Sequence, residues 1–208
     1  MDALFYYGCY ELDVQHLENA REIFTRCIRL TPRAEFFLKR GHALRLLRQD
    51  YLSLADYSQC IHLDPGRPYD LMSILDTYNF KCSSDNWQAF FYRGCMLSVA
   101  EPQQALRDLS VSLLIEDGVA NINAYLHRSK LYLSQSQYKD ALPDLQRVLD
   151  LNTTLVGSRT NVVYAVVASC QMGLIHMQYF RNLGAAIRSF LKRERGGGGG
   201  GGFFLVFF

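Results

Sequence analysis

The 208-residue sequence lacks a hydrophobic run long enough to span a membrane. Its longest apolar stretch, residues 162–175, covers about 14 residues and contains polar interruptions, whereas a spanning helix needs roughly 20. The first basic residue is Arg21, so no basic segment precedes an apolar core as in a secretory signal. We therefore expect no membrane span and a cytoplasmic location, and the same absences are compatible with a cilium.

The sequence also lacks a large excess of charge of one sign. Its formal net charge is +2, with 22 Lys and Arg against 20 Asp and Glu. Residues 1–180 carry a net charge of −2, and the basic excess lies in residues 181–195. A near-neutral body excludes a dominant electrostatic grip on a nucleic acid along the chain. Nucleic acid is therefore a disfavoured partner.

Motifs that carry catalysis or bind metal are missing as well. No two of the six cysteines lie within four residues of each other, so zinc-knuckle and CxxC spacings are absent. The five histidines form no HExxH motif, and the sequence contains no GxGxxG, P-loop or GxSxG pattern. We predict no enzyme, no metal site and no cofactor. A Cys–His nucleophile assembled from distant positions stays an open alternative.

Residues 196–208 have a composition unlike the rest. Gly196–Gly202 is a run of seven glycines, and Phe203–Phe208 is a run of six apolar residues. Because the run has the character of translated low-complexity nucleotide sequence, we interpret it as an artefact that is not folded. The functional alternative is a flexible linker that carries a hydrophobic anchor.

The rest of the chain contains an internal repeat. Three pairs of marker residues recur at a spacing of 33 positions, which makes coincidence a poor explanation. These pairs are Gly8 and Gly41, Cys27 and Cys60, and Pro32 and Pro65. Ala20, Phe24, Cys27 and Ile28 fall at helical spacing and form one apolar stripe. Because a single helix pair cannot bury such a face, we expect successive pairs to stack.

This pattern resembles the tetratricopeptide repeat, a helix–turn–helix unit of 34 residues. The resemblance implies an all-α, right-handed superhelical solenoid of four to five antiparallel helix pairs. We assign repeats to residues 1–33, 34–65, 87–118 and 122–153, and a weaker one to residues 160–195. Residues 66–86 are an insertion, which we interpret as an extra helix or an ordered loop. The array thus covers residues 1–195.

In proteins of this family the first helices of successive repeats line a concave groove that holds a peptide or a helix. Transferring the groove positions to this sequence gives nine candidate partner-binding residues. They are Phe5, Tyr6, Lys39, His42, Arg45, Phe91, Tyr92, His127 and Lys130. The aromatic pairs are candidate anchors, and packing against neighbouring helices is the alternative. The basic residues favour an acidic partner segment, and a solvated helix face is the alternative.

The resemblance implies a non-enzymatic scaffold or adaptor that binds other proteins. Family members that bind chaperone C-termini carry Lys at repeat position 5 and Asn at position 9. This chain has Phe5 and Cys9, Leu38 and His42, Phe91 and Cys95, and Leu126 and Lys130 at those positions. We therefore expect no chaperone-tail clamp. The alternatives are a structural subunit of a ciliary or transport complex, which uses the convex face or the array ends, and an RNA-binding helical repeat.

Overall fold

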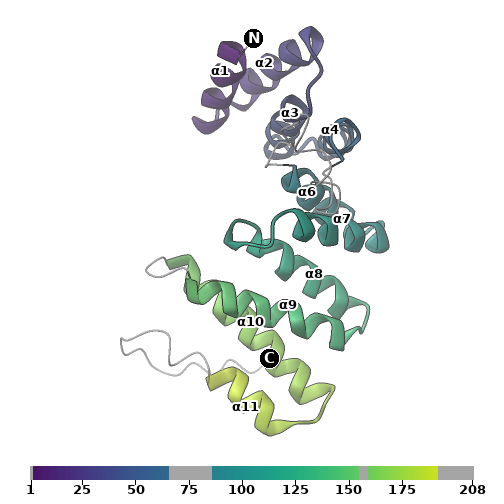
Figure 1. Ribbon diagram of the computed structural model, residues 1–208, viewed down its shortest axis with the longest axis vertical. Helices are drawn as coiled ribbons and strands as arrows, with labels where there is room; N and C mark the ends of the chain where they lie inside the picture. The colour runs from purple at the N-terminus through teal and green to yellow at the C-terminus, as the bar shows by residue number, and fades with distance from the viewer. Residues whose placement is uncertain (1, 66–85, 155–158, 192–208) are drawn as a thin grey trace, which may run out of the picture. The chain divides into compact units, whose positions relative to one another are not determined.

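The computed structural model describes residues 2–65, 86–154 and 159–191. This part of the chain contains ten α-helices, one 3₁₀-helix and no strand (Figure 1). Two compact regions are present, and we call Met1–Leu131 the first region and Tyr132–Phe208 the second region. The predicted insertion, apart from Asn86, and the predicted Gly/Phe tail lie outside the described residues, and the repeat boundaries stay predictions.

The first region consists of consecutive helix pairs. Its helices are α1 (Asp2–Asp13), α2 (Leu17–Leu30), α3 (Ala34–Leu46), α4 (Asp50–Leu63), α6 (Trp87–Leu97), α7 (Pro102–Ile115), the 3₁₀-helix Val119–Asn121 and most of α8 (Ile122–Ser134). The helices pack as α1 with α2, α3 with α4, and α6 with α7, and α2 also contacts α3, as α4 contacts α6. The predicted all-α class and its antiparallel helix pairs are confirmed.

Small residues set the distance between the two helices of a pair. A Cβ atom added to Gly8 would lie 2.8 Å from Cε1 of Phe24, and one added to Gly41 would lie 2.9 Å from Cε1 of Tyr57. Both rings are fully buried. Because any larger side chain at either glycine would displace an aromatic ring, the glycine and the ring form one packing unit.

A buried ion pair ties the second helix of a pair to the first. Arg40 on α3 donates two hydrogen bonds to the carboxylate of Asp56 on α4, at 2.8 and 2.7 Å. Arg93 on α6 does the same with Asp108 on α7, at 2.7 and 2.8 Å. A two-pronged guanidinium–carboxylate contact fixes the orientation of both helices. These ion pairs were not predicted from the sequence.

Two arginines, Arg40 and Arg128, reach the preceding helix pair. Nη1 of Arg40 donates to Oγ1 of Thr25 on α2 at 3.3 Å. Nη1 of Arg128 on α8 donates to Oγ of Ser110 on α7 at 3.0 Å. Each of these arginines is the seventh residue of its predicted repeat, so one position links consecutive pairs by a recurring contact.

The second region contains the end of α8, then α9 (Tyr138–Thr154), α10 (Arg159–Gln178) and α11 (Leu183–Leu191). Helix α10 packs against both α9 and α11. Its buried face carries Ala168 and Ile175, and α11 contributes Ala186. In the part of the chain that the structure describes, no helix combines the length and apolar character that crossing a bilayer requires.

Candidate functional site

Five of the nine predicted site residues form a continuous row of contacts across three helices. We call Arg45, His42, Tyr92, Phe91 and His127 the aromatic row. The guanidinium of Arg45 on α3 lies 4.6 Å from the ring centroid of Tyr92 on α6, and the ring of His42 lies 4.7 Å from it. Tyr92 meets Phe91 edge-on at 5.0 Å, and Phe91 meets His127 on α8 at 5.6 Å. The row therefore connects first helices of successive predicted repeats.

Tyr57 of α4 packs against two rings of the aromatic row. This ring is fully buried and stacks on Tyr92 with a centroid distance of 5.6 Å and an interplanar angle of 16°. It also meets His42 edge-on at 5.8 Å. Burial raises the pKa of Tyr57, so its hydroxyl stays neutral. Offset and edge contacts of this kind hold rings in one orientation, which gives the row a fixed shape.

The two histidines of the row are uncharged at neutral pH. Burial, with smaller effects from the neighbouring Lys39 and Arg45, lowers the pKa of His42 to about 3. Burial and the nearby Lys130 lower the pKa of His127. The positive charge of the row therefore resides on Arg45, and the imidazoles act as polar rings.

Arg45 differs from the arginines that tie the helix pairs together. It forms no ion pair with any residue that the structure describes, and its buried Nε has no hydrogen-bond acceptor there. Nε2 of His42 is likewise buried without a partner among these residues. Unpaired buried polar atoms cost about 1–3 kcal/mol each, so they require an explanation.

Lys39 and Lys130 place further positive charge beside the row. Lys39 lies on α3 close enough to Cys9 of α1 to influence the pKa of its thiol, and Lys130 is exposed on α8. Helices α3, α6 and α8 together carry six Lys or Arg and one acidic residue, Glu35. Two of the six, Arg40 and Arg93, are compensated by Asp56 and Asp108, so the excess positive charge beside the row comes from Lys39, Arg45 and Lys130.

The two remaining predicted residues lie apart from the row. Phe5 is half-buried, and its ring packs against Phe36 at 5.1 Å and Phe24 at 6.0 Å. The ring of Phe5 therefore packs against neighbouring helices, which was the alternative to its being a binding anchor. Tyr6 is 69% exposed and contacts the edge of Phe5 at 5.8 Å. The structure therefore separates the pair on α1 from the pair on α6.

Other candidate sites in the described residues do not suggest catalysis. No group of three or more His, Cys, Asp or Glu is placed to hold a metal ion there. Burial raises the pKa of Cys60 and of Cys95 to about 12, so neither thiol supplies a nucleophilic thiolate at neutral pH. A cavity of about 410 Å³ between α2, α3 and α4 has the Arg40–Asp56 pair in its wall.

Solved structures of one protein, MamA, are similar to this chain over most of both lengths. A crystal structure of MamA matches with a TM-score of 0.66 and 13% identity, covering 89% of this chain and 91% of that one. A second matches with a TM-score of 0.67 and 13% identity, covering 93% and 91%. MamA is a tetratricopeptide-repeat protein. The fold of this chain is tetratricopeptide-repeat-like.

A MamA RS-1 ArsTM double mutant matches in the same way, with a TM-score of 0.64, 15% identity and coverage of 93% of this chain and 94% of that one. A scan against protein-family models finds no match, and a search of curated proteins finds no relative. At such identities the likeness concerns the fold, so the tetratricopeptide-repeat-like architecture is established and the binding surface is argued from the residues themselves.

Proposed function

We propose that this chain is a non-enzymatic scaffold that binds a peptide or helix of another protein on the surface of its first helices. The aromatic row carries this proposal. Large, pre-ordered rings supply contact area at low entropic cost, and they are enriched among residues that dominate binding energy. The row runs across α3, α6 and α8, so an extended segment or a helix of a partner can follow it.

The charges specify the partner further. Among the residues that the structure describes, Arg45 has no carboxylate partner as Arg40 has in Asp56, and Lys39 and Lys130 extend the positive surface. A partner segment that places an acidic side chain between apolar ones satisfies both features. Phe5 is omitted from this surface because its ring packs in the core. The absence of a chaperone-tail clamp, the lack of catalysis and the cytoplasmic location are parts of the same proposal.

Affinity capture with charge-reversed baits tests this surface. The full chain with Lys39→Glu and Lys130→Glu is compared with the unchanged chain, and captured proteins are identified by mass spectrometry. The matched control is Arg26→Glu with Arg107→Glu, which reverses two exposed charges on the second helices α2 and α7. We expect partners to be lost from the first variant and kept by the control. Equal capture of the same proteins by all three baits would contradict the proposed binding surface.

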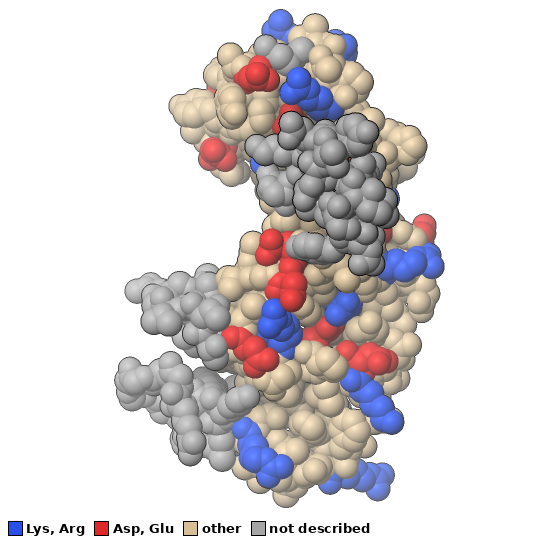
Figure 2. Space-filling view, in the orientation of Figure 1, with Lys and Arg blue, Asp and Glu red and all other residues tan. Residues whose placement is uncertain are grey.

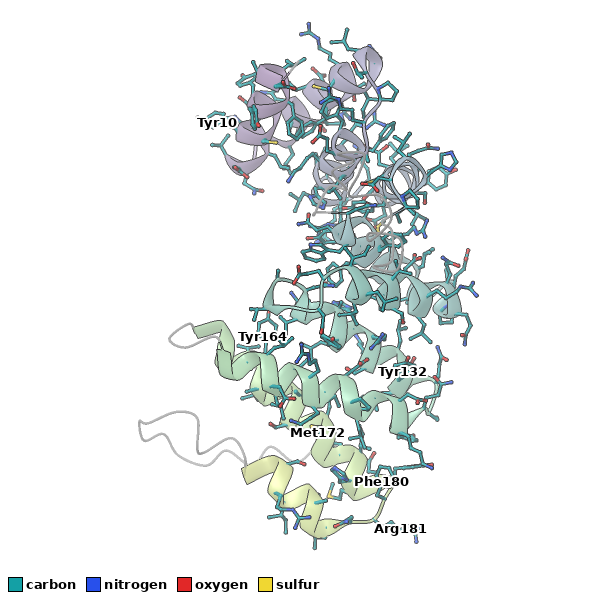
Figure 3. All side chains as sticks on the ribbon, viewed as in Figure 1. Tyr10, Tyr132, Tyr164, Met172, Phe180 and Arg181 are labelled. Carbon is teal, nitrogen blue, oxygen red and sulfur yellow. The ribbon has the colours of Figure 1, made fainter. Side chains whose placement is uncertain are left out.

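A structural role in a larger assembly is the second candidate function, and α1 supports it. Tyr6, Tyr7 and Tyr10 on this helix are 69%, 52% and 58% exposed. Figure 3 labels Tyr10 on the outer side of the helix. Exposed aromatic side chains gathered on one helix suit a stable contact with a neighbouring subunit. This role predicts a complex that survives the Lys39→Glu and Lys130→Glu changes and dissociates after Tyr6→Ser with Tyr10→Ser.

A further inference from the structure

Helix α3 packs on the preceding helix pair through three positions, which we call its stacking face. They are the third, seventh and tenth residues of the second predicted repeat, Phe36, Arg40 and Ala43. The ring of Phe36 lies 5.1 Å from that of Phe5 on α1, and Arg40 donates to Thr25 of α2. Ala43 is fully buried in one cluster with residues of α2. The stacking face thus holds one helix pair on the next.

The preceding first helix, α1, offers a matching receiving face at its fifth, ninth and twelfth residues. These are Phe5, Cys9 and Leu12, which are partly buried and pack against the cluster that contains Ala43 of α3. Because the chain reverses at two short turns between them, α1 and α3 run in the same direction. Equivalent positions of the two helices therefore lie at corresponding heights.

The stacking face of α1 itself is exposed. It consists of Ala3, Tyr7 and Tyr10, and the two tyrosines are 52% and 58% exposed. At the equivalent positions of α3, by contrast, Phe36 and Ala43 are fully buried. Helix α1 thus presents, with two aromatic rings, the surface that α3 uses to stack on another helix pair.

Helix α10 has the same pattern of positions. Gly173 is buried on it as Gly8 is buried on α1, and we align the two glycines at the eighth position. The third and tenth positions of α10 are then Ala168 and Ile175. Both are buried, as in the stacking face of α3, and α10 packs against the preceding helix α9. The burial pattern of α10 therefore agrees with this alignment.

The receiving face of α10 is apolar and exposed. The alignment places Cys170, Leu174 and Met177 at its fifth, ninth and twelfth positions. Leu174 and Met177 are 45% and 41% exposed, and the Cys170 side chain is exposed too. On α1 the equivalent residues are partly buried under α3. Helix α10 thus presents the surface on which a stacking face fits.

The two exposed faces lie on elements of opposite charge. Helix α1 contains three acidic residues and no Lys or Arg, whereas residues 159–191 contain three arginines and no acidic residue. Figure 2 shows basic but no acidic side chains over α10 and α11. Asp13, three residues after Tyr10, and Arg181, four residues after Met177, are both exposed. In the parallel arrangement of α1 and α3, these two charges come to the same end of the contact.

We propose that the stacking face of α1 docks on the receiving face of α10 in a second copy of this chain. Tyr7 and Tyr10 cover Leu174 and Met177, and Asp13 approaches Arg181. Every copy carries both faces, in matching register and with opposite charge, which favours a second copy over a different protein. The proposal rests on the second candidate function, whose neighbouring subunit it identifies, and it does not involve the aromatic row.

Sedimentation velocity of the full chain tests this contact. Tyr10→Ser alters the stacking face alone, and Leu174→Ser alters the receiving face alone. The matched control is Tyr51→Ser, which removes an 83% exposed ring on α4. We expect the unchanged chain and the control to associate with rising concentration, and the dissociation constant to be about tenfold higher in each of the other two variants. Circular dichroism checks that these exposed substitutions leave the helix content unchanged.

An equimolar mixture of the two variants identifies the head-to-tail arrangement. The intact α1 of the Leu174→Ser chain docks on the intact α10 of the Tyr10→Ser chain, and the two altered faces stop further growth. We therefore expect dimers in the mixture at a concentration at which each variant alone is monomeric. A mixture that stays monomeric would overturn the proposal.

Two further outcomes would also overturn it. An unchanged chain that is monomeric at every concentration has no such contact, even if Tyr10→Ser releases a different protein, which would leave the second candidate function standing. Association that is lost with Tyr10→Ser and kept with Leu174→Ser would place two α1 helices against each other. Lys39→Glu with Lys130→Glu should leave self-association unchanged, so the result is independent of partner binding at the aromatic row.

Discussion

The helix pairs α6/α7 and α10/α11 have the same antiparallel arrangement but different interiors. In α6/α7 the Arg93–Asp108 ion pair is almost completely buried, and Gly94 lies against Leu109 of the partner helix. In α10/α11 no acidic residue is present, so an ion pair cannot form within the pair. The glycine of α11, Gly184, has ordinary space around its Cα.

The two helix pairs therefore reach the same antiparallel arrangement through different kinds of contact. Buried charges and tight glycines fix the orientation of two helices, because few other arrangements satisfy them. Apolar contacts alone hold helices together but leave extra apolar surface exposed. Figure 3 labels Met172 on α10, with Phe180 and Arg181 at the turn that leads into α11. The pair α10/α11 is of this second kind, and Val163, Val167, Leu174 and Met177 of α10 are exposed apolar side chains.

Removing one partner of the buried ion pair has the largest expected effect. Asp108→Ala leaves the guanidinium of Arg93 without its carboxylate in a site where the two side chains are 17% and 3% exposed. We expect the free energy of unfolding to fall by about 3 kcal/mol, measured by urea denaturation followed by circular dichroism. Replacing both residues, with Arg93→Met and Asp108→Leu, should recover most of the loss. A single-variant loss below about 1 kcal/mol would show that the pair does not specify α6/α7.

Adding one methyl group to α6 is expected to have the next largest effect. A Cβ at Gly94 would lie 3.0 Å from Cγ of Leu109 and 3.2 Å from the carbonyl oxygen of Ala105. The carbonyl belongs to the backbone of α7 and cannot rotate away, so the helices must separate. We expect Gly94→Ala to lower the free energy of unfolding by about 1–2 kcal/mol in the same denaturation assay. An unchanged midpoint would indicate that α6 and α7 separate at little cost.

Acid should act on the first region through His42. Its pKa of about 3 in the folded chain lies below the value of about 6.5 expected when unfolded. The unfolded chain therefore binds the extra proton first, and stability falls as the pH drops from about 6.5 toward 3. We expect a loss of about 1 kcal/mol between pH 7 and pH 5.5 that His42→Gln reduces. Identical pH slopes for both chains, from thermal melts, would contradict this.

The smallest effect should have the opposite sign. A Cβ at Gly184 would meet the Arg188 guanidinium at 3.6 Å and the Asn182 side chain at 3.7 Å, both ordinary contacts. Because alanine favours helix over glycine, Gly184→Ala should raise the free energy of unfolding by about 0.5 kcal/mol. The matched comparison with Gly94→Ala isolates the space around each glycine. A loss on Gly184→Ala would mean that α11 is packed more tightly than its contacts indicate.

Much of the fold could be predicted because the residues that pack the two helices of a pair recur from one repeat to the next. Gly41 and Tyr57 lie 16 positions apart, and the same partners, Gly8 and Phe24, appear one period earlier. The resemblance to tetratricopeptide repeats, and with it the all-α helix-pair fold, is confirmed by the solved structures. The ion pair Arg40–Asp56 was harder to predict, because the first repeat has Tyr7 and Ile23 at the equivalent positions.

The site was less predictable because its contacts cross the insertion. His42 and Tyr92 are 50 residues apart, and nothing in their local sequence indicates that the rings meet at 4.7 Å. The equivalent positions also behave differently: Phe5 packs in the core, whereas Phe91 joins the row. The exposed apolar side chains of α10 could not be predicted, because periodicity indicates that a helix face is apolar but not whether another element covers it.

The link from Arg40 to Thr25 has a consequence for how such a chain grows. The second predicted repeat carries a donor, Arg40, which binds Thr25 of the first repeat, and the third carries an acceptor, Ser110, which accepts from Arg128 of the fourth. A duplicated repeat that had an arginine at its seventh position and such a hydroxyl on its second helix would carry both partners of this contact. Gene duplication or protein engineering can therefore lengthen the array at this joint without inventing a new one.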